Sequence, residues 1–177
     1  MALIKTTPPD EAEGKLAELY KETEAFFGAV PNNVRMYGVS PEILENQLGF
    51  IGYYMQHPTL TMPVLAMIRM LTAESMNSPY CVGMNKMLLT RAGLTPEQIE
   101  EAKIDLEKVP LQEKEKAMIL FVLKVVKDPK GVTPSELDGL RGLGWSDRDI
   151  FDAVVHGARA VGTNIIFDAF KIETEFC

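Results

Sequence analysis

Cys81 is the residue of this chain whose position most suggests chemistry. It follows Ser78 and Pro79 in the stretch NSPYCVGMN, residues 77–85. Serine followed by proline is typical of a helix start, with serine as N-cap and proline at the first helical position, so Cys81 would be the third helical residue. Free backbone N–H groups and the positive end of the helix dipole stabilise a thiolate there. The spacing predicts a reactive thiol, and a buried structural cysteine is the alternative.

Two polar residues could act together with Cys81. Asn85 comes four residues later and would lie on the same helix face, where its amide could hydrogen-bond a thiolate or a ligand but could not carry a proton as histidine does. Glu74 comes seven residues earlier, near the end of the preceding predicted helix. A short break at residues 77–78 could fold Glu74 over the thiol as a base, and a solvated surface glutamate is the alternative.

The two histidines are predicted to have other roles. His57 would end a helix, which favours a cap or a surface position. His156 shares one stripe of its predicted helix with Asp149, Asp152 and Arg159. That stripe is predicted to be a solvated or subunit-contact face. The sequence contains no cluster of metal ligands, no phosphate-binding loop and no nucleophile elbow, so neither a metal nor a cofactor is expected.

Helices are predicted along the whole chain to position these residues. Hydroxyl caps recur at Ser40, Thr95, Thr133 and Ser146, and Thr95 and Thr133 have a Gln or Glu three residues later, which completes a capping box. No run of strict alternation marks a strand. The fold class is therefore all-α. The predicted helices cover residues 10–27, 31–38, 41–56, 62–76, 79–92, 96–104, 111–128, 134–142 and 147–170.

Composition favours one soluble domain over residues 1–177. Apolar residues make up 46% and charged residues 24% of the chain, which is ordinary for a globular protein. The net charge of −7 without a basic cluster disfavours nucleic acid and membrane as partners. Only Cys81 and Cys177 are present, which fits a reducing compartment and a cytoplasmic protein, and a disulfide between the two stays open.

Two predicted helices have apolar patterns that bear on packing. Helix 10–27 is amphipathic, with Leu16, Leu19, Tyr20 and Phe26 on one side. Helix 111–128 is apolar on all sides between residues 117 and 123, so it should be central or lie against another subunit. A homo-oligomer is therefore expected.

The stretch ESMNSPYCVGMNKMLLTRAGLTPEQIEE, residues 74–101, resembles the core of the carboxymuconolactone decarboxylase and alkylhydroperoxidase D superfamily. The usual pattern there is a glutamate, then Asn-Gly-Cys-x-Tyr-Cys, a histidine four residues later, and a helix ending in Ala-Gly-Leu-[ST]. Residues 8–44 and 110–154 agree with the flanking parts of the family, so the resemblance covers nearly the whole chain. It implies an alkylhydroperoxidase D-like helical bundle, in a family whose members form dimers, trimers or hexamers.

The resemblance also implies which parts of the family site this chain keeps. The second, peroxidatic cysteine falls on Cys81, the tyrosine before it on Tyr80, and a glutamate found in some members on Glu74. The first, resolving cysteine falls on Ser78. The histidine falls on Asn85, and a relay glutamate of other members falls on Ala66. Cys81 and Glu74 are thus the expected catalytic residues, with Ser78, Tyr80 and Asn85 as substrate-binding residues of a degenerate site.

Three functions follow as hypotheses. The first is a one-cysteine thiol peroxidase or redox-responsive protein that uses Cys81, a small-molecule substrate and an external thiol reductant. Because position 78 has no thiol, its sulfenic acid could not form the family's internal disulfide. The second is a catalytically silent relative that binds a small molecule. The third is lactone chemistry of the decarboxylase kind, which would need an acid–base group where Asn85 stands.

Overall fold

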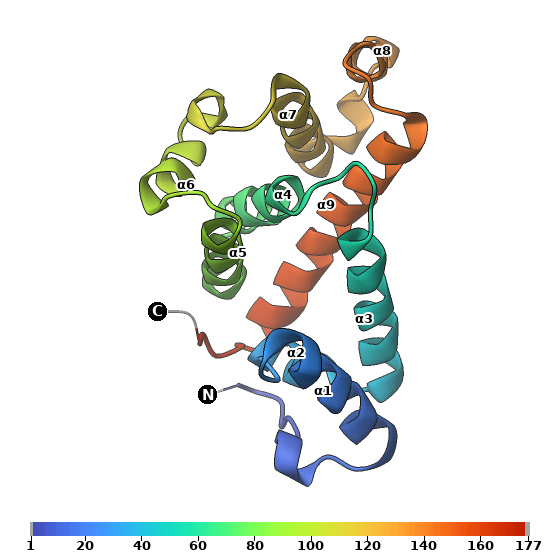
Figure 1. The fold of residues 1–177 in the computed structure, drawn as a ribbon, viewed down its shortest axis with the longest axis vertical. Helices are drawn as coiled ribbons and strands as arrows, with labels where there is room; N and C mark the ends of the chain where they lie inside the picture. The colour runs from blue at the N-terminus through green and yellow to red at the C-terminus, as the bar shows by residue number, and fades with distance from the viewer. Residues whose placement is uncertain (1, 176–177) are drawn as a thin grey trace. The chain divides into compact units, whose positions relative to one another are not determined.

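The structure, a computed structural model, describes residues 2–175, which form nine α-helices and no β-strand (Figure 1). The predicted all-α fold is confirmed. Each predicted helix matches an observed one. The largest difference is at α1, which starts at Gly14 because Pro9–Glu11 form a separate 3-10 turn. The helices are α1 (Gly14–Phe27), α2 (Asn32–Tyr37), α3 (Pro41–Met55), α4 (Met62–Ser75), α5 (Pro79–Arg91), α6 (Pro96–Ala102), α7 (Glu113–Lys127), α8 (Pro134–Gly142) and α9 (Asp147–Ala169).

The described residues form two compact units. Unit 1 contains residues 2–57 and 166–175, and unit 2 contains residues 58–165. Helix α9 belongs to unit 2 up to Ile165 and to unit 1 beyond it. The prediction of a single domain over residues 1–177 stays a prediction. Within residues 2–175, no helix combines the length and the apolar character needed to cross a membrane.

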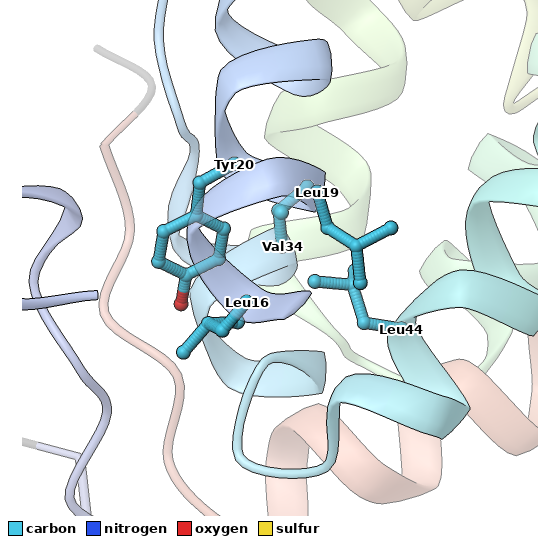
Figure 2. Packing of buried hydrophobic residues seen from close by; sticks show 5 residues of the cluster. All are labelled: Leu16, Leu19, Tyr20, Val34 and Leu44. Atoms are coloured by element: carbon cyan, nitrogen blue, oxygen red, sulfur yellow. The ribbon is translucent and has the colours of Figure 1, made fainter. Parts of the chain in front are cut away.

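Unit 1 has a small apolar core. Figure 2 shows its five central side chains, which come from α1, α2 and α3: Leu16, Leu19, Tyr20, Val34 and Leu44. The three from α1 follow the helical spacing that the sequence predicts. The same prediction is wrong for Phe26, which is 60% exposed. The buried stripe of α1 ends at Thr23, one turn earlier, and Phe26 packs edge-on against Phe27 instead.

Unit 2 is built around the helical hairpin of α4 and α5, which pack against each other. The link between them is three residues long, 76–78, so the two helices run antiparallel. Asn77 has a left-handed backbone with φ of 55°, a conformation that asparagine tolerates better than most residues. The amide of Ser78 donates to the Ala73 carbonyl at 3.0 Å, which closes the turn directly before α5.

Helix α9 approaches α7 and α4 closely within unit 2. A Cβ added at Gly157 would overlap Cγ1 of Val122 and would lie 3.4 Å from Val126 Cγ2 and 3.6 Å from Ile68 Cγ2. Glycine is therefore needed at this point of α9 for the contact to form. The close contact fixes the neighbouring residue, His156, against α4.

The predicted caps are confirmed in part. Thr95 and Gln98 form the predicted capping box, with hydrogen bonds of 2.9 and 3.3 Å. The Ser146 hydroxyl accepts from the Asp149 amide at 3.1 Å and caps α9. Ser40 and Ser78 occupy the predicted N-cap positions, but neither side chain makes a capping hydrogen bond. The predicted N-cap positions of the two serines are therefore confirmed, and the predicted capping bonds of their hydroxyls are wrong.

Candidate functional site

Cys81 lies at the third position of α5, where the sequence predicts it, after Ser78 at the N-cap and Pro79. Its side chain is 4% exposed. Ser78 stands at the expected N-cap position, but its side chain makes no capping hydrogen bond. Its place in the first turn of α5 puts Cys81 near the positive end of the helix dipole, which favours negative charge. The sequence left open whether Cys81 pairs with Cys177, and Cys177 lies outside the residues that the structure describes.

Asn85 connects Cys81 to helix α4. Its Nδ2 donates to the Cys81 carbonyl at 2.7 Å, and its Oδ1 accepts from Nε of Arg69 at 2.7 Å. The side chain is fully buried. The amide therefore binds the Cys81 backbone and Arg69, and its expected role in binding substrate stays a prediction.

Arg69 in turn contacts His156 of α9, with 2.9 Å between Nη1 and Nε2. Arginine can only donate, so Nε2 is the acceptor and the ring proton is on Nδ1. Burial lowers the pKa of His156 well below 6.5, and the Arg69 cation lowers it further. His156 is therefore a neutral acceptor that orients the guanidinium.

Arg69 remains a cation at neutral pH. Burial lowers the pKa of its guanidinium to about 10, and the charge of a Cys81 thiolate acts in the opposite direction. An electrostatic interaction is mutual. A positive Arg69 therefore favours the thiolate form of Cys81, whereas burial of the sulfur favours the neutral thiol. Together, Cys81, Asn85, Arg69 and His156 form the Cys81 cluster, whose members come from α5, α4 and α9 in unit 2.

The other predicted site residues divide into two groups. Ser78 and Tyr80 are buried beside Cys81 in the chain. Glu74 forms a salt bridge with Lys103, at a side-chain exposure of 33%. Lys103 donates hydrogen bonds to Glu74 and to Glu100, and these bonds, that to Glu74 first, raise the pKa of Lys103. The contacts of Glu74 thus point to the surface, and its role as the base stays a prediction.

Two members of the Cys81 cluster were missed by the sequence reasoning. The prediction that this stripe of α9 faces solvent is wrong for His156 and Asp149, which are buried. It is confirmed for Arg159, which is exposed. Arg69 was not considered, although it is the only charged residue between Met62 and Ala73. A single cation within an apolar helix costs free energy unless it has partners, and this signal could have identified it. Among residues 2–175, no group of three or more metal-ligand side chains is present.

A separate groove lies in unit 1, with a volume of about 650 Å³. It is lined by residues of α1 and α3: Gly14, Lys15, Glu18, Leu19, Glu22, Glu45, Leu48 and Gly49. Lys15 and Glu45 form an ion pair of 2.6 Å there. The groove contains no residue of the Cys81 cluster.

No protein-family model and no curated protein matches the chain. Solved structures do match. An uncharacterized peroxidase-related protein from Silicibacter sp. TM1040 has 18% identity and a TM-score of 0.85, with 97% of this chain and 91% of the other covered. An uncharacterized peroxidase-related protein with the alkylhydroperoxidase AhpD core, from Ralstonia eutropha JMP134, has 19% identity and a TM-score of 0.86, with coverage of 98% and 92%.

The debrominase Bmp8 is also similar. The structure of a variant in which a cysteine is replaced by alanine, in complex with 2,3,4-tribromopyrrole, has 16% identity and a TM-score of 0.77, with coverage of 99% and 92%. Identities this low show the fold alone, and peroxidase-related proteins and a debrominase share that fold. The resemblance found in the sequence is thus confirmed at the level of the fold: the chain has the helical fold of the alkylhydroperoxidase D-like proteins.

Proposed function

We propose that this protein is a one-cysteine thiol peroxidase in which Cys81 reduces small hydroperoxides and an external thiol restores it. The observation that carries the proposal is the hydrogen-bonded chain from the Cys81 backbone through Asn85 to the guanidinium of Arg69. A buried cation linked to Cys81 through Asn85 and the first turn of α5 both favour the thiolate, which is the form of cysteine that attacks a peroxide. His156 and Asn85 keep the cation in place through the 2.9 and 2.7 Å contacts.

The reaction balances with one hydroperoxide and two external thiols. The Cys81 thiolate attacks the terminal peroxide oxygen, the O–O bond breaks, and the alkoxide takes a proton from water to leave as the alcohol. Cys81 is then a sulfenic acid. A first external thiol converts it to a mixed disulfide and releases water, and a second thiol displaces Cys81 and forms the external disulfide. Ser78 supplies no thiol, so the external pair is required.

The burial of Cys81 limits the substrate. With 4% of the side chain exposed, a compact hydroperoxide can reach the sulfur with less rearrangement of the protein than a bulky one. Hydrogen peroxide and short-chain alkyl hydroperoxides are therefore the favoured substrates. Glu74 enters the proposal as the base that first removes the thiol proton, which would require it to leave Lys103.

The test measures Cys81 oxidation in the Cys177→Ser background. We expect hydrogen peroxide to add one oxygen to Cys81, seen by mass spectrometry after trapping in denaturant, and turnover to require an added thiol. Arg69→Met should raise the pKa of Cys81 by about one unit and so slow iodoacetamide alkylation near pH 7 about tenfold. Glu74→Gln is the matched variant. It should change the rate–pH profile if Glu74 is the base and leave it unchanged if Glu74 only pairs with Lys103.

Other outcomes would reject the proposal. A Cys81 that reacts with neither peroxide nor iodoacetamide up to pH 9 would be structural, and the protein would then be a silent binding relative. Loss of bromide from 2,3,4-tribromopyrrole, together with inertness to peroxides, would indicate the activity of the debrominase that shares the fold. An Arg69→Met variant that alkylates as fast as the parent would remove the basis of the proposed thiolate.

A further inference from the structure

Arg69 of α4 carries a positive charge that no carboxylate of residues 2–175 balances with an ion pair. Its two hydrogen-bond partners, Oδ1 of Asn85 and Nε2 of His156, are both neutral. Cys81 can balance the charge only while its thiol is ionised. A cation that is largely withdrawn from water and lacks a paired anion costs free energy, so its presence calls for a reason.

Another cation of unit 2 shows the arrangement that burial normally requires. Lys116 of α7 is 7% exposed, and its Nζ lies 3.2 Å from Glu113 Oε1 and 3.4 Å from Glu107 Oε2. Two carboxylates therefore balance the charge of Lys116. Arg69 has no such partner within residues 2–175.

The carboxylates closest to Arg69 and His156 along their own helices are paired elsewhere. On α4, Glu74 forms its salt bridge with Lys103. On α9, Asp152 Oδ2 lies 3.6 Å from Nε of Arg148, one turn earlier. The charge of Arg69 is thus left to the Cys81 thiolate or to an anion from outside the described part of the chain.

The guanidinium also has hydrogen-bond donors to spare. Nε and Nη1 each make one hydrogen bond, which leaves one N–H on Nη1 and both on Nη2. Nη2 has no hydrogen-bond partner among residues 2–175, yet protein atoms do not enclose it fully, and part of the Arg69 side chain is accessible. A small ligand can therefore reach these donors.

We propose that Arg69 is the binding site of a small organic acid, which it holds by the carboxylate. A carboxylate accepts two parallel hydrogen bonds from a guanidinium, and its single negative charge balances the single positive charge of Arg69. A phosphate dianion would instead bring excess charge into a largely buried site. Asn85 and His156 hold the guanidinium in place for the ligand through the 2.7 and 2.9 Å contacts. This inference goes beyond the proposed function, because the site does not require Cys81 to react.

The experiment measures thermal unfolding at pH 7 with acetate as the probe, and chloride replaces acetate so that the ionic strength stays constant. A ligand that binds only the folded state raises its stability, so we expect Tm to rise with acetate, with a dissociation constant on the order of 1 mM. Arg69→Lys keeps the charge but loses the planar pair of donors, and it should weaken acetate binding about tenfold. Lys21→Met is the matched control, because it removes an exposed cation of α1 and should leave the binding unchanged.

A parent protein with the same Tm in acetate and in chloride would overturn the inference. Salts also stabilise proteins without binding, through exclusion from the protein surface. A rise of Tm that is equal in the parent and in Arg69→Lys would have that origin and would overturn the inference as well. Should Arg69→Lys not fold, NMR of the parent decides: acetate bound to Arg69 shifts the ring signals of His156, which contacts the guanidinium, and leaves those of His57 in place. Unchanged His156 signals would reject the site.

Discussion

At the scale of single residues, the Cys81 cluster combines one charge with one neutral acceptor. A protonated His156 would place two cations in contact inside the protein, because its Nε2 lies 2.9 Å from Arg69 Nη1. The folded state avoids this by keeping the pKa of His156 low. As the pH falls, His156 should therefore begin to destabilise the folded state at a higher pH than the protonation of most carboxylates does.

The first prediction concerns the pH dependence of stability. Below about pH 6.5 an unfolded chain protonates His156, whereas the folded chain, with its lowered pKa, does not. The unfolded state then binds more protons, so the free energy of unfolding should fall with decreasing pH, by up to about 1.4 kcal/mol per pH unit. His156→Gln keeps an acceptor for Arg69 and removes the titration. Denaturant unfolding at pH 7, 6 and 5 should show a shallower loss for this variant.

The matched control uses the other histidine. His57→Gln removes a titrating group outside the Cys81 cluster, so it should retain the contribution of His156 between pH 7 and 5. A His156→Gln protein that loses stability as steeply as the parent over this range would show that His156 is not a neutral acceptor in the fold.

The sequence was informative about Cys81 because its environment is local. A serine and a proline within three residues set the start of α5, and the structure confirms that start. Arg69 and His156 lie 12 and 75 residues from Cys81 in the chain, so only the packing of α4 and α9 brings them into the cluster. The helical stripe of His156 was recognised, but a stripe alone does not tell which neighbour covers it.

At the scale of elements, the close approach of α9 depends on Gly157. Alanine favours a helix by about 1 kcal/mol over glycine, so without crowding the change Gly157→Ala would stabilise the protein. Here the added methyl would meet Val122, a branched side chain of α7 that is fully buried. We expect a net destabilisation of about 1 to 3 kcal/mol, measured by denaturant unfolding.

Gly162 provides the control in the same helix. A Cβ at Gly162 meets nothing within 4 Å among the described residues. Gly162→Ala should therefore be neutral or stabilising by up to about 1 kcal/mol. Stabilisation by both substitutions would mean that α9 can move away from α7 at no cost, and the position of His156 would then be less constrained than the structure indicates.

Helix positions were predictable to within a few residues because caps and apolar spacing are local properties of the chain. The predictions that failed concern what surrounds a helix. Phe26 continues the apolar spacing of α1, yet it is exposed and packs edge-on against Phe27 instead of entering the core. The hydroxyl of Ser78 stands at the right position for a cap, but the cap bond depends on a rotamer that the sequence does not determine.

At the scale of the whole molecule, we propose that the protein is a homo-oligomer. Large apolar side chains of unit 2 remain exposed in the single chain, at 88% for Ile104, 68% for Phe151 and 48% for Leu120. Leu120 belongs to α7, the helix whose all-round apolar sequence predicts either a central position or a subunit contact. Burying such residues against another copy would remove apolar area from water.

Sedimentation at micromolar concentration should therefore give a mass that is a multiple of 19.7 kDa. Leu120→Glu should shift the distribution toward the single chain, because a charge in an apolar contact costs several kcal/mol. The charged residue Lys130 offers a control on an exposed turn, and Lys130→Glu should leave the mass unchanged. A parent protein that sediments only at 19.7 kDa would contradict the assembly.

The burial of Cys81 has a consequence for time as well as for reactivity. A thiol with 4% exposure meets a reagent only during brief local openings of the protein. At high reagent concentration the opening itself limits the rate, so chemically unlike reagents converge on one maximal rate. The same local opening limits the reduction of oxidised Cys81, because a thiol reductant also reaches the sulfur only when the protein opens. Oxidised Cys81 would then persist after the oxidant is removed, so the fraction of oxidised protein would reflect earlier contact with oxidant.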